Sequence, residues 1–476
     1  MRVHWLPPLL PFGQAVFLAL CLILVAVALV LAKDRRRVLL MAAVVTGAWQ
    51  GGLWLARFNT DIRLTHIFLF GLFVWQFIEP QKQVYFRKQY MRILLPWSLL
   101  IIWSALAITQ ALNTDYARMG PLTFLIDALA VYVMVSVVRT PRDLQFFLVV
   151  ICFSVIGQSV LALVQFKFHF FKLGVIDEAA SWMWWRARGS FFHPNHLGIF
   201  LASTLPLVLR GLIGAIAGRD KKMMYITSAA FLLGGGGLLA TFNRGSWVGL
   251  AAGLLVMVFM DMFGRGGKVK KVARGMLVAG ILVAMAGSVK YGALILDRFI
   301  NSDRQEQEAN RSMQAEEAIA LIKQKPLLGV GYKNDIFYSS TIFVHNNYLL
   351  IAAETGLVGL GFFLWFLFEF WRMIVRSVRS KIPTVSNYGK GYVAGIIAFM
   401  IASIPGPDFW INEGVQMHFF VLVAFMISML RIENKLIELQ RKKKREQRMA
   451  QRAASAANQQ NAAANGSENG AGPRPF

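Results

Sequence analysis

Long apolar runs recur along the whole chain and are separated by short polar or charged segments. A run of about 20 apolar residues is long enough to cross the hydrocarbon core of a bilayer as a single helix. We therefore expect an all-α polytopic membrane protein with about 12 to 13 transmembrane helices. The expected spans cover residues 14–32, 38–55, 66–80, 91–112, 120–138, 143–165, 196–217, 222–242, 246–263, 272–290, 346–372, 390–405 and 414–431.

Basic residues set the expected orientation of these spans. The 476 residues carry a net charge of +25, and 56% of them are hydrophobic. The charge alone would fit a nucleic-acid-binding protein, but lysine and arginine concentrate between the apolar runs and in the C-terminal tail. This distribution is typical of the positive-inside rule and of contact with anionic lipids, so we expect membrane lipids and no nucleic acid as partners. The segments expected in the cytoplasm are 33–37, 82–92, 139–142, 219–222, 265–274 and 372–381.

The remaining loops are expected on the external side of the membrane. They are 56–65, 113–119, 166–195, 243–246, 291–345 and 406–413. If every apolar run crosses, the N-terminus is external as well, whereas one re-entrant run would place both termini in the cytoplasm. The sequence leaves this open.

The pattern also divides the chain into four regions. They are a transmembrane bundle at 1–290, an external helical segment at 291–345, the C-terminal spans at 346–432, and a basic, then disordered, cytoplasmic tail at 433–476. The low-complexity composition after Ala453 is the reason to expect disorder there.

Within the external segment, apolar residues recur at helical spacing. Met313, Ala318, Ile319 and Ile322 predict one face of an amphipathic helix, and Pro326 ends it. We expect this helix to lie over the outer surface as a lid.

The most polar helix start in the chain comes directly after this segment. His345, Asn346 and Asn347 stand at the mouth of an apolar run, where an unpaired polar group is costly. Small residues behind them, Ala352, Ala353, Gly356 and Gly359, would let another helix pack closely. The stretch predicts a helix that holds an active-site group at a membrane surface, or equally a helix capped by asparagine with an interfacial His345.

Several arginines lie in loops that should be external, where arginine is normally depleted. They are Arg118, Arg188, Arg244 and Arg311. A planar guanidinium suits phosphate oxygens, although for any single arginine a salt bridge or snorkelling is the simpler explanation. We expect all four on the same side of the membrane as His345, and together they favour anion binding. The sequence shows no external carboxylate cluster and no metal or cofactor motif, so we expect neither a metal nor a cofactor.

These residues together resemble a known family. Pro326-Leu-Leu-Gly-Val-Gly331, followed by His345-Asn346, nine residues, Gly356, two residues and Gly359, resembles the hallmark region of the O-antigen ligase/polymerase superfamily. Arg188-Gly-Ser with Pro194-Asn195, and Asn243-Arg244-Gly245, stand where the family carries its external arginines, and Arg118 with Leu122 resembles an element of the ligases. The Thr-Thr that some ligases carry after the second glycine is replaced by Leu360-Gly361, which departs from the ligase pattern.

The resemblance implies a GT-C-like glycosyltransferase of the bacterial inner membrane with its active site facing the periplasm and its C-terminus in the cytoplasm. It implies transfer of a glycan from undecaprenyl diphosphate to a lipid A-core hydroxyl, without metal and with inversion. His345, Arg244 and Arg188 would be catalytic. The residues expected to bind substrate are Arg118, Arg186, Arg311, Asn346 and Tyr348.

Other functions fit the same residues. A polysaccharide polymerase and a protein O-oligosaccharyltransferase would use the same donor, and a carrier would move the lipid-linked glycan without chemistry. The sequence decides neither the acceptor nor the sugars nor the oligomeric state.

Overall fold

The computed structural model describes residues 22–32, 34–47, 52–55, 60–78, 88–168, 175–176, 185–263, 271–272, 275, 304–338 and 344–468. The chain divides into two compact units, residues 1–428 and 429–476. Most of the predicted span 272–290, and residues 291–303 of the predicted external segment, lie outside the described residues.

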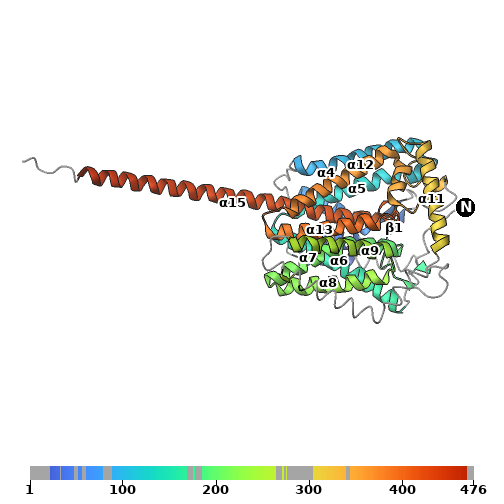
Figure 1. The fold of residues 1–476 in the computed structure, drawn as a ribbon, viewed down its shortest axis with the longest axis horizontal. Coiled ribbons are helices and arrows are strands. Elements are labelled where there is room, and N and C mark those ends of the chain that lie inside the picture. Colours follow the sequence, from blue (N-terminus) through green and yellow to red (C-terminus); the bar gives the residue numbers. More distant parts are fainter. Residues whose placement is uncertain are drawn as a thin grey trace, which may run out of the picture. The chain divides into compact units, whose positions relative to one another are not determined.

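The described chain is built almost entirely of helices (Figure 1). They are α2 (Arg35–Gly47), α3 (Leu64–Ile78), α4 (Lys88–Ala107), α5 (Thr114–Val137), α6 (Pro141–Phe168), α7 (Pro194–Gly218), α8 (Lys221–Ala240), α9 (Arg244–Phe263), α11 (Arg304–Gln324), α12 (Asn347–Val378), α13 (Pro383–Ala402), α14 (Asp408–Ile411) and α15 (Glu413–Glu468), with 3-10 turns η1 (Ile108–Gln110) and η3 (Asp335–Phe337). Two short antiparallel strand pairs join β1 (Gly52–Leu55) to β2 (Thr60–Arg63) and β3 (Val175–Ile176) to β4 (Trp185–Arg186).

Eight of the described helices are long and apolar enough to cross a membrane: α4 to α9, α12 and α15. The prediction of an all-α polytopic membrane protein is therefore confirmed. The predicted span 38–55 is wrong in its second half, because α2 ends at Gly47 and residues 52–55 form β1. The glycine pair Gly51-Gly52 at this point disfavours a helix.

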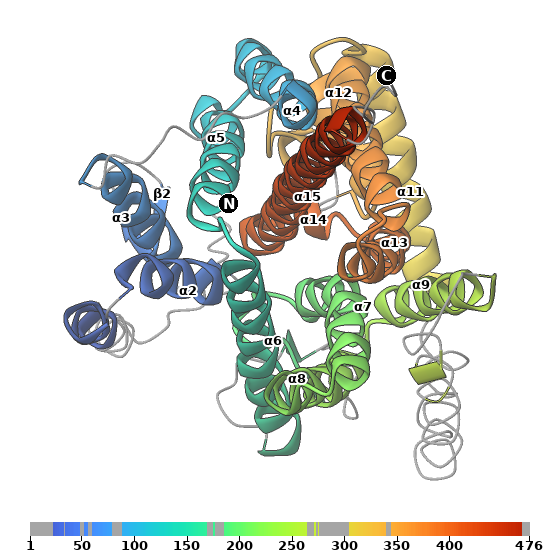
Figure 2. The same cartoon turned by 90° about the vertical axis from the view of Figure 1, so that its left-hand side faces the viewer.

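The helices of residues 1–428 pack around the first part of α15 and around α13. In Figure 2, α13 lies between α12 on one side and α7 and α9 on the other, and it packs against all of them. Aromatic rings of α15 contact three further helices: Phe420 is 4.7 Å from Trp97 of α4, Phe425 is 5.5 Å from Phe147 of α6, and Phe419 is 4.7 Å from Phe399 of α13, measured between ring centroids.

The C-terminal unit is helical further than the sequence suggested. Residues 453–468, predicted to be disordered, continue α15 as far as Glu468. Alanine, which has the highest helix propensity, is the commonest residue of this stretch before Gly466. Residues 469–476 lie outside the described part of the chain.

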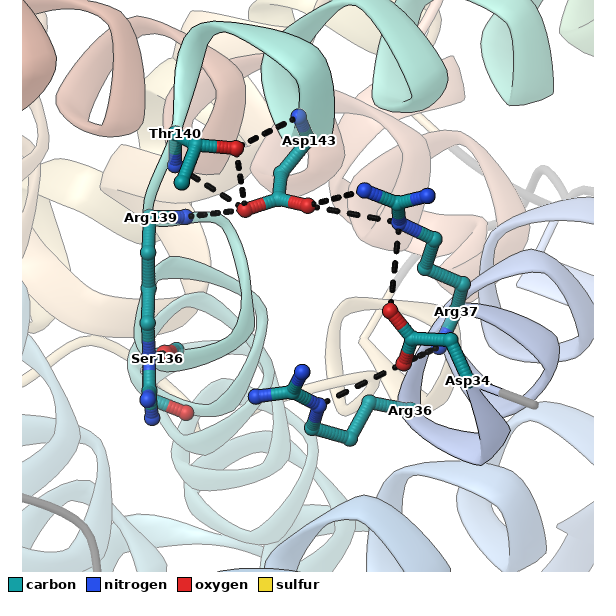
Figure 3. A network of polar contacts seen from close by, with 7 residues as sticks. All are labelled: Asp34, Arg36, Arg37, Ser136, Arg139, Thr140 and Asp143. Atoms are coloured by element: carbon teal, nitrogen blue, oxygen red, sulfur yellow. Dashed lines mark hydrogen bonds and ion pairs between the residues drawn. The ribbon is translucent and has the colours of Figure 1, made fainter.

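Segments predicted to be cytoplasmic meet at one end of the first unit. The Asp143 carboxylate at the start of α6 accepts a 2.7 Å hydrogen bond from Arg37 Nη2, and it also accepts from the backbone N–H groups of Arg139 and Thr140 (Figure 3). Gln145 on α6 donates to Asp220, at the start of α8. Three of the predicted basic segments are thus hydrogen-bonded around the start of α6.

Segments predicted to be external meet one another as well. Arg63 of β2 forms a 2.7 Å ion pair with Glu413, and the Asn113 N–H donates to Asn334 at 2.8 Å. These contacts join the loop before α3 to the start of α15, and the start of α5 to the loop after α11. The candidate site lies among these segments that are predicted to be external.

Candidate active site

The hallmark loop that begins at Pro326 is docked on α12 by backbone hydrogen bonds. The Val330 N–H donates to the Ala353 carbonyl at 2.9 Å, and the Gly331 N–H donates to the Glu354 carbonyl at 2.8 Å. These carbonyls are available because α12 loses its helical dihedral angles at Gly356, where φ is 70° and ψ is 177°.

Glycine at position 356 is required by this contact. Its φ lies in the left-handed region, and a Cβ there would collide with the Leu327 carbonyl of the loop. The Leu357 N–H, which follows the break, donates to the Pro326 carbonyl at 2.8 Å. The small-residue face was predicted to receive another helix; at Gly356 it receives the hallmark loop instead.

Glu354 fixes the same loop from the inside of the protein. Its side chain is fully buried and accepts hydrogen bonds from Trp410 Nε1 at 2.6 Å and from the Lys333 N–H at 2.7 Å. Asp335, the first residue of η3, is also buried, and burial raises the pKa of its carboxyl. This part of the hallmark region is therefore a scaffold under the site.

The start of α12 presents His345 at the surface of the protein. The Asn346 side chain caps the helix by accepting from the N–H groups of Tyr348 and Leu349, at 3.0 and 3.1 Å. Asn347 is buried, and its Oδ1 accepts from the Trp410 N–H at 3.0 Å. His345 is exposed, and its Nδ1 lies 2.8 Å from Oε1 of Gln314 on α11. Asn346 therefore caps the helix, as predicted for the asparagines, and His345 faces outward.

Two of the predicted arginines are held in place between β4 and α7. Arg186 donates from Nη2 to Asn195 Oδ1 at 2.8 Å and from Nε to the Thr241 carbonyl at 2.9 Å. Arg188 donates from Nη1 to the Phe192 carbonyl at 2.9 Å, and burial lowers the pKa of its guanidinium. Both side chains are thus fixed before any substrate arrives.

His193 connects these arginines to His345. It caps α7, and its Nδ1 accepts from the Asn195 N–H at 3.1 Å. Burial lowers the pKa of His193 well below its usual value, and the charges of Arg186 and Arg188, and of His345 when it is protonated, lower it further. Side chains from β4, α7 and the start of α12 therefore share one electropositive region.

The negative charge in this region comes from a residue that the sequence did not single out. Asp408, at the start of α14, lies 3.3 Å from His196 Nε2, measured to its Oδ1. Asn412 Nδ2 lies 2.7 Å from His196 Nδ1, so the amide donates to Nδ1 and Nε2 bears the proton toward Asp408. The only sequence signal was an aspartate in the predicted external loop 406–413.

Arg244 begins α9 at the same end of the bundle. Its neighbour Asn243 donates from Nδ2 to the Asn195 carbonyl at 3.3 Å and accepts from the Ser246 N–H at 3.3 Å. The start of α9 is therefore tied to the start of α7 through Asn195, whose side chain Arg186 also binds. Arg244 itself is half-buried.

The other predicted binding residues are exposed or half-buried. Arg118 is exposed and forms a 3.6 Å ion pair with Asp115 of its own helix. Arg311 is exposed on α11, three residues before Gln314. Tyr348, in the first turn of α12, is half-buried, and its ring centroid lies 6.5 Å from that of Phe363.

The side chains of the cluster have a composition that would suit an anion. Arginine and histidine nitrogens outnumber carboxylates in it, and hydrogen-bonded guanidinium groups are suited to phosphate oxygens. Among the described residues, no group of three or more His, Cys, Asp or Glu side chains is placed to hold a metal ion.

Comparison with known proteins gives a match over one part of the chain, which contains Arg244 and His345 but not Arg186, Arg188 or Asp408. Residues 229–364 match the family described as O-antigen ligase. The matched range contains Arg244, α11, the hallmark loop, His345, Gly356 and Gly359. The chain matches none of the curated proteins with which it was compared. Residues 229–364 of the chain are therefore similar to the O-antigen ligase family.

Proposed function

We propose that the protein is an O-antigen ligase, which transfers a glycan from undecaprenyl diphosphate to a hydroxyl group of lipid A-core at the periplasmic face of the inner membrane. The observation that carries the proposal is the pair of guanidinium groups fixed by hydrogen bonds, Arg186 on Asn195 and Arg188 on the Phe192 carbonyl. His193 lies between Arg188 and Asn195 in the sequence, and its pKa is lowered by burial and also by the charge of protonated His345. These residues belong to segments whose charge predicts an external position.

In the proposed reaction, the acceptor oxygen attacks the anomeric carbon and the bond from that carbon to the diphosphate oxygen breaks. The electron pair of that bond leaves with undecaprenyl diphosphate, and the acceptor proton passes to His345. Direct displacement inverts the anomeric centre. A positioned general base of this kind contributes a factor of about 10² to 10⁴ in rate.

Arg188 and Arg244 would stabilise the charge that develops on the diphosphate. A preorganised donor in a site from which water is excluded contributes about 3 kcal/mol to such a transition state. Arg188 suits this role because it is already hydrogen-bonded to the Phe192 carbonyl, so its side chain loses little conformational entropy on binding. Arg186, held by Asn195, would bind the same group.

The remaining predicted residues would bind outer parts of the substrates. Arg311 lies on α11, where we propose that it contacts the glycan beneath the lid, together with Tyr348 at the start of α12. Arg118 is exposed at the start of α5 and would meet a lipid head group or the acceptor. Asn346 would act through α12, by fixing the helix turn that carries His345.

A polymerase or a protein O-oligosaccharyltransferase is the second candidate. Leu360-Gly361 in place of Thr-Thr favours it, since this is where the chain departs from the ligases it resembles. Both would use the same donor site and base, with a different hydroxyl as acceptor.

The test is transfer by the purified protein in detergent with EDTA present. Undecaprenyl-diphosphate glycan is supplied with lipid A-core or alone, and the products are measured by gel and by mass. A core-linked product supports the ligase, and longer lipid-linked chains without core support the polymerase. Loss of all product with EDTA, restored by a divalent cation, would refute the metal-independent mechanism.

His345→Ala is the matching variant, and we expect it to lower the rate about 10²-fold or more. Full transfer by this variant would remove His345 from the mechanism. Flux of the lipid-linked glycan across liposomes without a new linkage would instead support a carrier.

A further inference from the structure

In the part of α11 whose side chains are described, from Arg311 onward, the buried polar side chain is Gln314, and it contacts His345. Gln314 is 6% exposed. Its Oε1 lies 3.2 Å from the His345 backbone nitrogen and 2.8 Å from His345 Nδ1. A buried amide that meets both the backbone and the ring of the same histidine restricts how that ring is oriented.

The two contacts together decide which ring nitrogen of His345 bears the proton. A backbone N–H can only donate, so the Gln314 atom that it meets must be the amide oxygen rather than the nitrogen. The same oxygen faces Nδ1 and can only accept, so neutral His345 must carry its proton on Nδ1. The lone pair is then on Nε2, which is the nitrogen able to take a proton from an acceptor hydroxyl.

Gln314 is itself held firmly. One and two turns further along α11, Ala318 and Leu321 are buried, and Leu321 packs against Val330 of the hallmark loop and Ala353 of α12. Lys325, just after the helix, donates to the Gln110 carbonyl at 3.0 Å. The position of Gln314 is thus tied to the loop and to the helix that carries His345.

The face of α11 differs from the sequence prediction. Met313 and Ile319, predicted to be on the buried face, are 40% and 42% exposed. The face that is buried carries Gln314, Ala318 and Leu321, at positions i, i+4 and i+7. The polar residue in that face has no packing role that an apolar residue could not fill.

We propose that Gln314 is a positioning residue that holds His345 in the Nδ1–H tautomer, with Nε2 ready to act as the base; this rests on the proposed role of His345. The lid helix then does more than cover the glycan, because the base is correctly set only while α11 is docked. Gln314 touches no reacting atom and acts through the imidazole.

The first experiment reads the tautomer without any transfer reaction. The full chain is labelled with ¹⁵N-histidine, and the nitrogen shifts are recorded at a pH where imidazole is neutral; a His345→Gln sample identifies the His345 signals. We expect the Nδ1–H form in the wild type and loss of that preference in Gln314→Met. An Nε2–H form in the wild type, or an unchanged Nδ1–H form in Gln314→Met, overturns the proposal.

The second experiment separates positioning from packing by kinetics. Gln314→Met keeps the volume but removes the acceptor, and we expect kcat to fall about 10- to 100-fold with little change in KM. Gln314→Glu keeps an acceptor for both donors, so it should retain most of the rate. Its negative charge favours the imidazolium, so the acid limb of the pH–rate profile should move to higher pH.

Gln324→Met is the matched control, because Gln324 is exposed at the end of the same helix. It should leave kcat unchanged. Equal losses in Gln314→Met and Gln314→Glu with no shift of the pH profile would mean that Gln314 is only structural. If the wild type transfers no glycan but its tautomer responds to Gln314→Met as expected, the proposed transferase function fails and the positioning of His345 stands.

Discussion

His196 and Asp408 meet across the site end of the bundle, with His196 Nε2 3.3 Å from Asp408 Oδ1. Both side chains are almost fully buried, and one comes from the first turn of α7 while the other begins α14. Burial raises the pKa of Asp408 to about 7, although the positive charge of Arg186 lowers it. The carboxyl therefore changes its charge near neutral pH, beside the arginines that we propose to bind diphosphate.

Asp408 should make the stability of the protein depend on pH. Folded Asp408 binds its proton more tightly than the unfolded chain does, because its pKa is raised from 3.8. Its stabilising contribution is thus fully present below about pH 4 and is lost as the pH rises through about 7, with an amplitude of a few kcal/mol. Asp408→Asn cannot ionise, so its unfolding temperature in detergent should fall less than that of the wild type between these values.

Asp115→Asn is the control for this measurement, since Asp115 is 68% exposed and pairs only with Arg118 in the described residues. It should keep the wild-type dependence on pH. An Asp408→Asn variant with the same slope as the wild type would show that Asp408 does not titrate in this range.

Two glycines of α12 predict opposite effects when each is replaced by alanine. Gly356 has a φ of 70°, and a Cβ there meets the Leu327 carbonyl, so Gly356→Ala should destabilise the protein by about 1–3 kcal/mol or more. Gly361 lies five residues further on, with nothing within 4 Å of an added Cβ. Gly361→Ala should therefore stabilise α12, by up to about 1 kcal/mol.

Thermal unfolding in detergent measures both variants. Equal unfolding temperatures for the two would contradict the docking of the loop on the break in α12.

The sequence predicted the membrane class, the two groups of loops and the hallmark stretch, because each is written in contiguous residues. Runs of apolar residues and the charges between them are local signals, and so is the spacing from His345 to Gly359. The break of α12 at Gly356 could not be predicted, since a glycine within an apolar run is also compatible with a continuous helix that packs closely against another.

The hydrogen-bond partners of His345 and His196 could not be predicted, for a different reason. Gln314 lies 31 residues before His345, and Asn412 lies 216 residues after His196. No local periodicity marks a glutamine in a mostly polar helix as buried, and the pattern of α11 instead favoured Met313 and Ile319 as the packed residues. Only the tertiary packing of α11 on α12 identifies Gln314.

Arg188 offers the sharpest test of diphosphate recognition. Its guanidinium is fixed by the Phe192 carbonyl and shares the electropositive region of His193 and His345. Arg188→Ala should lower kcat about 10²- to 10³-fold, because it removes a preorganised donor from the leaving group. Arg188→Lys keeps the charge but loses the planar pair of donors, so its rate should lie between those of the wild type and Arg188→Ala.

The measurement is the initial rate of transfer at several donor concentrations, which separates kcat from KM. Arg372→Ala is the control: Arg372 is an exposed arginine that pairs with Glu369 in the C-terminal half of α12, far along the helix from His345. A rate for Arg188→Ala equal to that of Arg372→Ala would remove Arg188 from the reaction. A rise in KM without any loss of kcat would mean that Arg188 binds the diphosphate equally well before and during bond cleavage, and therefore contributes affinity rather than catalysis.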